Sequence, residues 1–197
     1  MSDMTVRQPQ KPTPDLVREY VARFQKDRAA SDTDKALSKL FQLLHDNRLI
    51  EDVLLKVVAV NSLLSTSILA TYAVAEHICK LDVDEKIERG SPEVVNQIAS
   101  VEIAGKTRNN YVFATKFCSF HAPDAYPKCD GNTEGLIWAY QELYAFAQVQ
   151  RVDDLRDYPK YKATMERFRI YFGLVDFSFK QIDHFLWGYG RDWKENQ

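Results

Sequence analysis

Residues 109–133 read NNYVFATKFCSFHAPDAYPKCDGNT. Apolar side chains recur at helical spacing around Lys116, and Pro123 and Pro127 then interrupt the pattern. Asp130 follows beyond this turn, fourteen residues after the lysine. A lysine on a helix and a carboxylate just past the next loop can converge on one cavity. The stretch therefore predicts both a helix–loop–helix arrangement and a candidate active site.

The rest of the chain also has helical patterns. Pro14 suits the first turn of a helix, and two pairs resemble capping boxes, Ser31 with Asp34 and Ser178 with Gln181. No hairpin turn flanked by alternating residues is evident, so the sequence predicts an all-α fold. The expected helices cover about 14–30, 31–46, 50–60, 61–81, a helix opened by Ser91-Pro92-Glu93, 109–122, 132–149, 159–172 ended by Gly173, and 179–190, which Gly188 and Gly190 stop. Periodicity alone also allows a strand at 50–60, but the absence of Gly and Pro up to Leu81 favours a helix.

A length of 197 residues suits one compact multi-helix domain. Residues 1–13 are polar and proline-rich and predict a disordered arm, which leaves 14–197 as the domain. Two small lobes with the active site between them are the alternative.

Composition excludes several classes of protein. Hydrophobic residues make up 45% and charged residues 27%, with a net charge of −2. This balance does not point to a nucleic-acid binder, although residues 105–128 carry four basic side chains against one acidic. Three cysteines without a CxxC pair argue against a disulfide framework or a metal site, and no apolar run is long enough for a membrane span. We expect a cytoplasmic protein.

Three stretches together resemble the helix-hairpin-helix base-excision DNA glycosylases, in particular the compact OGG-like branch. They are Thr115-Lys116 followed by Pro127 and Asp130, then NSLLST at 61–66, and IDHFLW at 182–187. The resemblance covers roughly residues 47–190. It implies an all-α glycosylase fold, with a flipped base held between helices.

The resemblance also implies roles for particular residues. Lys116 would be the nucleophile that attacks the sugar, and Asp130 would stabilise the positive charge that develops there. The expected base pocket consists of Asn61, Ser65, Thr66, Asp183 and Trp187. The expected phosphate contacts are Lys106, Arg108 and Lys128.

The expected activity is excision of a damaged or modified base from duplex DNA, with strand cleavage as an AP lyase. No metal, organic cofactor or membrane is implied, and we expect a monomer that associates with the nucleoid when it binds DNA. Nothing selects the base, so repair of damage and action against modified phage DNA both stay open.

Structural explanations exist for the same residues. Asp130 also suits the cap of the next helix, and Asn61, Ser65 and Thr66 are also typical packing residues. Two other classes of protein therefore stay open. One is a non-catalytic DNA-binding module, which the single glycine in residues 104–110 favours. The other is an all-α interaction or defence-system protein in which Lys116 and Asp130 form only a salt bridge, as the negative net charge favours.

Overall fold

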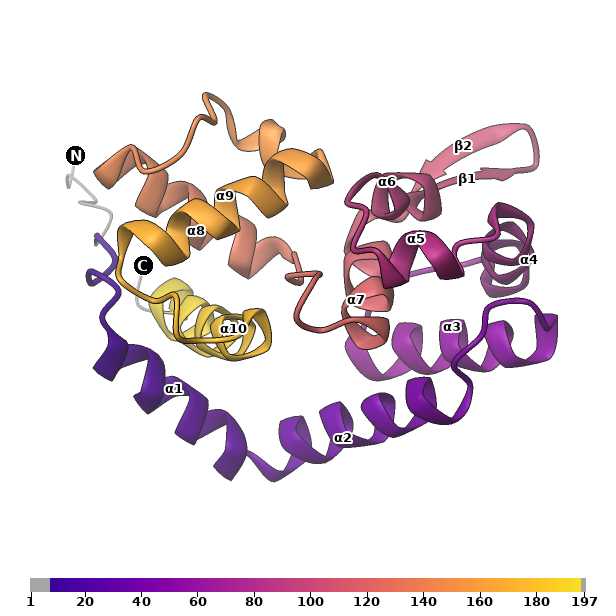
Figure 1. Cartoon of the computed structure of the whole chain (residues 1–197), viewed down its shortest axis with the longest axis horizontal. Helices are drawn as coiled ribbons and strands as arrows, with labels where there is room; N and C mark the ends of the chain where they lie inside the picture. Colours follow the sequence, from indigo (N-terminus) through magenta and orange to yellow (C-terminus); the bar gives the residue numbers. More distant parts are fainter. Residues whose placement is uncertain (1–7, 196–197) are drawn as a thin grey trace.

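The computed structural model describes residues 8–195 and is mainly helical, as predicted. Figure 1 shows the order of its elements. The helices are α1 (Pro14–Lys26), α2 (Arg28–Leu43), α3 (Ile50–Leu64), α4 (Thr71–Leu81), α5 (Asp84–Glu88), α6 (Glu93–Ala99), α7 (Tyr111–His121), α8 (Gly131–Tyr144), the 3₁₀ helix η1 (Val152–Arg156), α9 (Tyr158–Tyr171) and α10 (Phe179–Glu195).

The helices gather in two groups that α1 and α2 connect (Figure 1). α1 packs against α10, which also packs against α8, whereas α2 packs against α3 and α7. The segment 122–130 leads from α7 in one group to α8 in the other. Within residues 8–195, no helix is long and apolar enough to cross a membrane.

A two-stranded hairpin is the exception to the all-α prediction. Strands β1 (Ser100–Ile103) and β2 (Lys106–Asn109) pair antiparallel through a turn at Ala104 and Gly105. Both turn residues have positive φ, 51° and 72°, which matches a tight two-residue turn. The sequence pattern missed the hairpin because Ala104 carries no turn signal and β2 is exposed throughout.

Several predicted helix ends are confirmed by their contacts. The Thr13 side chain accepts a hydrogen bond from the amide of Leu16 at the start of α1, with Pro14 in the first turn. At the start of α10, the Ser178 hydroxyl accepts from the Gln181 amide, and the Gln181 side chain accepts from the Ser178 amide. This reciprocal pair is the predicted capping box.

Other predicted boundaries are wrong. The box at Ser31 and Asp34 does not exist, because α2 begins three residues earlier and Asp27 accepts from the Ala30 amide as its cap. The predicted start, with Ser91 as cap, lies one residue too early. Helix α6 begins at Glu93, and Pro92 occupies the cap position without a side-chain hydrogen bond. The helix predicted for 132–149 ends at Tyr144.

The helix predicted for 61–81 is also interrupted. The chain leaves α3 at Ser65, and residues 65–70 form a loop before α4. Asn61 stabilises the loop, since its amide oxygen accepts from the Ile68 amide at 2.8 Å. This local hydrogen bond competes with helix continuation, which periodicity alone does not register.

The N-terminal arm needs a partial correction. The Gln10 backbone donates to the Tyr189 hydroxyl and accepts from the Tyr140 hydroxyl, so residues 8–13 contact α8 and α10. The expected free arm therefore does not include Gln10. Residues 1–7 lie outside the described part of the chain.

Gly188 and Gly190 do not stop α10, which continues to Glu195. Gly188 instead allows α1 to approach, since a Cβ at this position would lie 2.9 Å from Tyr20 Cδ1. The Tyr20 hydroxyl in turn donates to Asp192 at 2.8 Å. A glycine in the middle of α10 therefore serves close packing between the two helices.

Gly188→Ala should lower the free energy of unfolding by about 1–2 kcal/mol, because the clash with the Tyr20 ring outweighs the gain in helix propensity. Gly135→Ala is the matched control, since it lies inside α8 with no atom within 4 Å of the added Cβ. That variant should be up to about 1 kcal/mol more stable than wild type. Urea unfolding of both variants measures the difference, and equal destabilisation by both would contradict this packing role.

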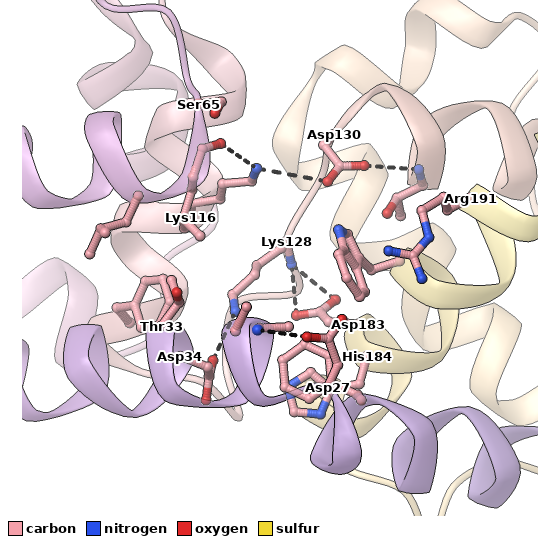
Figure 2. Close-up of a pocket in the computed structure, with 18 residues that line it drawn as sticks. Asp27, Thr33, Asp34, Ser65, Lys116, Lys128, Asp130, Asp183, His184 and Arg191 are labelled. Atoms are coloured by element: carbon pink, nitrogen blue, oxygen red, sulfur yellow. Dashed lines mark hydrogen bonds and ion pairs between the residues drawn. The ribbon is translucent and has the colours of Figure 1, made fainter.

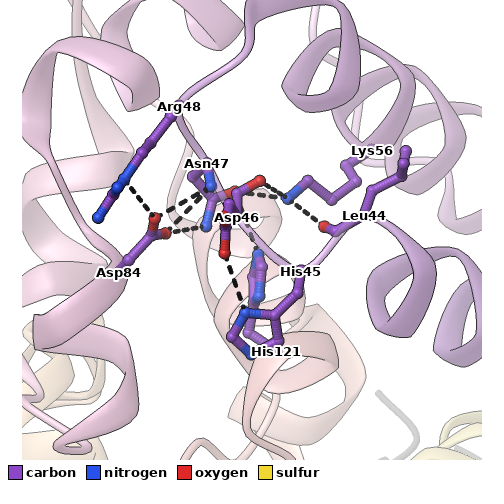
Figure 3. Close-up of polar contacts among 8 residues, drawn as sticks. All are labelled: Leu44, His45, Asp46, Asn47, Arg48, Lys56, Asp84 and His121. Atoms are coloured by element: carbon purple, nitrogen blue, oxygen red, sulfur yellow. Dashed lines mark hydrogen bonds and ion pairs between the residues drawn. The ribbon is translucent and has the colours of Figure 1, made fainter.

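A buried polar cluster closes the end of α2 (Figure 3). The fully buried Lys56 ammonium donates to the carbonyls of Leu44 and Asp46 and to the Asn47 side chain, at 2.7–2.9 Å. His121 Nε2 lies 3.2 Å from the same Asn47 oxygen. Burial, with a smaller effect of the nearby Lys56 charge, lowers the pKa of His121 to about 3.

The buried His121 should make the fold sensitive to acid. Below about pH 6.5 the unfolded chain binds a proton at this histidine, whereas the folded protein does not until about pH 3, so stability falls as the pH falls through this window. The slope should reach about 1.4 kcal/mol per pH unit. His121→Gln should reduce the slope, and His77→Gln, outside the cluster, should not. Identical slopes in wild type and His121→Gln would refute this account.

Candidate functional site

A cavity of about 450 Å³ lies between α1, α2, α7 and α10 and contains the predicted lysine and acid. Figure 2 shows its lining seen between the two groups of helices. Three aromatic side chains, Phe24, Phe120 and Trp187, line the cavity together with charged and polar ones. The principal charged and polar members are Asp27, Asp34, Lys116, Lys128, Asp130, Asp183, His184 and Arg191.

Lys116 and Asp130 meet at one side of this cavity. Lys116 Nζ lies 3.7 Å from Asp130 Oδ2 and 3.5 Å from the Leu64 carbonyl oxygen. Only 12% of the lysine side chain and 24% of the aspartate side chain are exposed. The pair is therefore held in a largely desolvated position that still opens into the cavity.

Asp130 is also a helix cap. Its Oδ1 accepts hydrogen bonds from the amides of Asn132 and Thr133, each at 3.1 Å, at the start of α8. The cap uses Oδ1 and leaves Oδ2 for Lys116. The structural and the chemical interpretation of this residue are thus compatible, because the cap fixes the carboxylate that faces the amine.

The segment between the two residues is fixed by buried hydrogen bonds. The Thr115 hydroxyl accepts from the Cys129 amide and lies 3.1 Å from the Cys129 carbonyl oxygen. The hydroxyls of Tyr158 and Tyr161 on α9 donate to the carbonyls of Pro127 and Lys128. These contacts attach the segment to α7 and α9 and so determine where Asp130 begins α8.

Asp183 holds the same segment from α10. Both of its carboxyl oxygens lie within hydrogen-bond distance of the Lys128 amide, at 3.1 and 3.2 Å. Burial raises the pKa of Asp183 to about 8, despite the nearby Lys128 ammonium. Burial therefore favours the neutral, protonated form of this carboxyl more than it would for an exposed aspartate.

The Lys128 side chain is largely buried and lines the cavity. Its Nζ lies 3.6 Å from Asp34 Oδ1 and 4.3 Å from the Phe120 ring centroid, inside the cavity. Burial lowers the pKa of this lysine. Burial also acts to raise the pKa of Asp34, but Lys128 and Lys180 together hold it below its ordinary value. Lys128 therefore belongs to an internal ion-pair network, which the sequence analysis did not expect.

An aromatic wall forms the opposite side. The Phe24 and His184 rings stack 3.7 Å apart, Trp187 stands edge-on to Phe24 at 5.7 Å, and the Arg191 guanidinium lies over the Trp187 ring. Burial lowers the pKa of His184 to about 4, with Lys128 adding to the effect. His184 Nε2 is buried without a hydrogen-bond partner. The cavity therefore has a flat aromatic side, whereas the His184 nitrogen itself is buried behind it.

A second cavity of about 470 Å³ adjoins the first at Asp130, which lines both. Thr66, Ser67 and Asn110 are among its lining residues, together with the start of α8. The two cavities therefore meet at the Asp130 carboxylate, which faces Lys116.

The structure brings only part of the predicted site together. Ser65, Lys116, Lys128, Asp130, Asp183 and Trp187 all line the first cavity. Asn61 does not, since its side chain bonds within the loop after α3, and Thr66 bonds to Asn61 and faces the second cavity. Lys106 and Arg108 lie exposed on β2.

Sequence reasoning missed most of the other residues that line the cavity, including Asp34, Phe24, His184 and Arg191. Asp34 was assigned to a helix cap, although a carboxylate on the apolar side of an amphipathic helix is itself a signal of a buried partner. Phe24, His184 and Arg191 carry no signal in the linear pattern, since aromatic and basic residues at helical spacing are common. Only the approach of α1 to α10 places them side by side.

Comparison with known proteins identifies the family of this chain. The family model HI_0787_N, described as an N-terminal domain, matches residues 16–125, more than half of the chain. An uncharacterized protein of Haemophilus influenzae is 34% identical over 150 residues, which are 76% of this chain and 71% of that protein. The chain therefore belongs to the HI_0787_N family. No solved structure matches it.

The resemblance to the helix-hairpin-helix glycosylases is wrong. The matched family is a different one, and no model of those glycosylases matches the chain. The segment at 104–110, which the resemblance equated with their phosphate-binding hairpin, forms the turn and second strand of a β-hairpin. Helical periodicity and a few shared residues were too general to identify a family.

Thr115→Val should lower the free energy of unfolding by about 1–3 kcal/mol, because it leaves the buried Cys129 amide without its acceptor. Thr115→Ser keeps the hydroxyl and loses one methyl group, so it should cost only about 0.8 kcal/mol. Denaturant unfolding compares the two variants. If serine were as destabilising as valine, packing instead of the hydrogen bond would attach the segment to α7.

Proposed function

We propose that this protein breaks the bond between a base and its deoxyribose in DNA, with Lys116 as nucleophile and Asp130 as its partner. The observation that carries the proposal is the 3.7 Å approach of Lys116 Nζ to Asp130 Oδ2 beside an aromatic-walled cavity. A buried amine beside a carboxylate is the arrangement that an amine nucleophile needs. This geometry supports an amine nucleophile, whereas DNA as the substrate is the expectation stated in the sequence analysis.

The chemistry uses groups that line the cavity. Asp130 accepts a proton from Lys116, and the free amine attacks C1′ of the sugar. The C1′–N bond breaks, and its electron pair leaves with the base, which takes the proton of Asp183. Asp130 is neutral once it holds the lysine proton, and its role as the cap of α8 keeps it beside the attacking amine.

An imine then forms when the sugar ring opens. A proton on the lysine nitrogen, which is now bonded to C1′, passes to the ring oxygen. The bond between C1′ and the ring oxygen breaks, and C1′ is left doubly bonded to the lysine nitrogen. Loss of a proton from C2′ allows the 3′ phosphate to leave, which cuts the strand. Hydrolysis of the imine would instead release an abasic site and restore the free lysine.

The cavity suits a flat, uncharged ring. A base that leaves the stack would lie against Trp187 and Phe24, where stacking recovers part of the cost of extrusion. Lys106 and Arg108 on the exposed β2 strand remain the candidates for phosphate contacts.

Borohydride trapping tests the proposal directly. Wild-type protein should form a covalent adduct with an abasic duplex, and with one member of a panel of duplexes that carry single modified bases. Lys116→Ala should abolish the adduct, and Asp130→Asn should reduce it at least tenfold, as expected for loss of a proton acceptor. Lys80→Ala, an exposed lysine on α4, is the control and should trap like wild type.

Circular dichroism should show that every variant folds. Folded wild-type protein that binds duplex DNA without an adduct would favour a non-catalytic DNA-binding module. Neither binding nor an adduct would leave Lys116 and Asp130 as a structural ion pair in an interaction protein.

A further inference from the structure

One face of α10 places three different kinds of side chain along the first cavity. Asp183, Trp187 and Arg191 are spaced four residues apart, so they share one face of the helix, and all three line the cavity. Asp183 is only 6% exposed, whereas 47% of the Arg191 side chain is exposed. The acid therefore lies at the inner end of the cavity, the indole in the middle and the guanidinium at the outer end.

The Arg191 guanidinium is held in place but has unused hydrogen-bond donors. Its Cζ lies 4.7 Å from the Trp187 ring centroid, on the α10 side of the cavity (Figure 2). Within residues 8–195 the guanidinium makes no hydrogen bond, and its ion pair with Asp192 is long, at 3.9 Å. Asp192 also accepts hydrogen bonds from Tyr20 and Arg23. The donors of Arg191 are therefore available to a ligand.

Other arginines that lie over aromatic rings differ from Arg191. Each has a close polar partner: Arg18 has Asp15, Arg23 has Glu19, and Arg169 has the Val175 carbonyl. None of these three arginines lines either of the two cavities. Stacking on a ring thus accompanies a satisfied guanidinium elsewhere, and Arg191 is the case in which the stacked group faces a cavity with its donors free.

The order of groups along α10 matches the order of groups in a nucleotide. A guanidinium with free donors suits a phosphate, because its planar donors can pair with two phosphate oxygens. At 1.5 Å per residue, Arg191 and Asp183 are about 12 Å apart along the helix axis, which is enough to span one nucleotide from its phosphate to its base. The Trp187 ring lies between them, where the base would stack.

We infer that Arg191 binds a phosphate that flanks the reacting sugar while the base lies against Trp187. The inference rests on the proposed function. Such a contact would use binding energy from a non-reacting part of the substrate to hold C1′ near Lys116. Because the guanidinium is already held on the indole, it would lose little entropy when the phosphate binds.

Duplex binding by Lys116→Gln protein, which cannot form an adduct, tests the inference. The duplex carries a tetrahydrofuran abasic analogue, and fluorescence anisotropy measures its Kd. Adding Arg191→Ala should weaken binding roughly 10-fold and lower the slope of log Kd against log salt by about one. Each phosphate that flanks the analogue is then replaced in turn by an uncharged methylphosphonate. One replacement should weaken binding by Lys116→Gln protein roughly 10-fold but leave the protein that also carries Arg191→Ala unchanged.

Arg18→Ala in the same Lys116→Gln protein is the matched control. Arg18 is also an exposed arginine over an aromatic ring, but it lies outside both cavities. This variant should lose affinity at the same methylphosphonate as Lys116→Gln protein. Circular dichroism should show that all three proteins fold.

Borohydride trapping with wild-type protein tests the chemistry separately, so the outcomes distinguish the two claims. If Arg191→Ala and Arg18→Ala respond alike to both methylphosphonates, the phosphate contact is overturned, while an adduct on Lys116 would still stand. A methylphosphonate effect that depends on Arg191, without any adduct, would support the phosphate contact and reject the lysine chemistry. Neither binding nor an adduct would overturn both.

Discussion

The site depends on how residues 126–130 are attached to their surroundings. Thr115 on α7 and Asp183 on α10 hold the amides of Cys129 and Lys128, and two tyrosines of α9 hold neighbouring carbonyls. Three helices from both groups thereby fix one short segment. Because this segment ends at the cap of α8, the same contacts determine where Asp130 meets Lys116.

Burial then gives chemically similar groups different properties. Asp183 is buried against a backbone amide and has a raised pKa, whereas Asp34, between two lysines, has a lowered one. The cavity therefore combines a carboxylic acid, carboxylates and amines within one small volume. Separation of pKa values among neighbouring groups is typical of sites that transfer protons.

Sequence reasoning reached the parts of this arrangement that depend on local patterns. Lys116 on its helix, Asp130 as cap and partner, and the Ser178 box follow from spacing and capping rules. The break at Ser65 and the continuation of α10 past Gly188 do not, because the first depends on one asparagine side chain and the second on Tyr20 of a distant helix. The ion pair of Lys128 was not foreseen for the same reason, since its partner Asp34 lies far away in sequence.

The family could not be read from these patterns either. Membership in the HI_0787_N family comes from the comparison alone, and the matched region ends at residue 125, before Asp130 and α10. The matched region therefore contributes Lys116 and Phe24, and the C-terminal part contributes the carboxylate partner and the rest of the aromatic wall, His184 and Trp187. The proposed chemistry needs both parts.

The most direct test of the central claim is to locate the covalent bond. Protein reduced with borohydride on an abasic duplex would be digested with a protease and its peptides analysed by mass spectrometry. The account predicts that the sugar remnant is found on Lys116 in the peptide that contains α7. A remnant on another lysine, such as Lys106 of the exposed hairpin, or no modified peptide, would contradict the account.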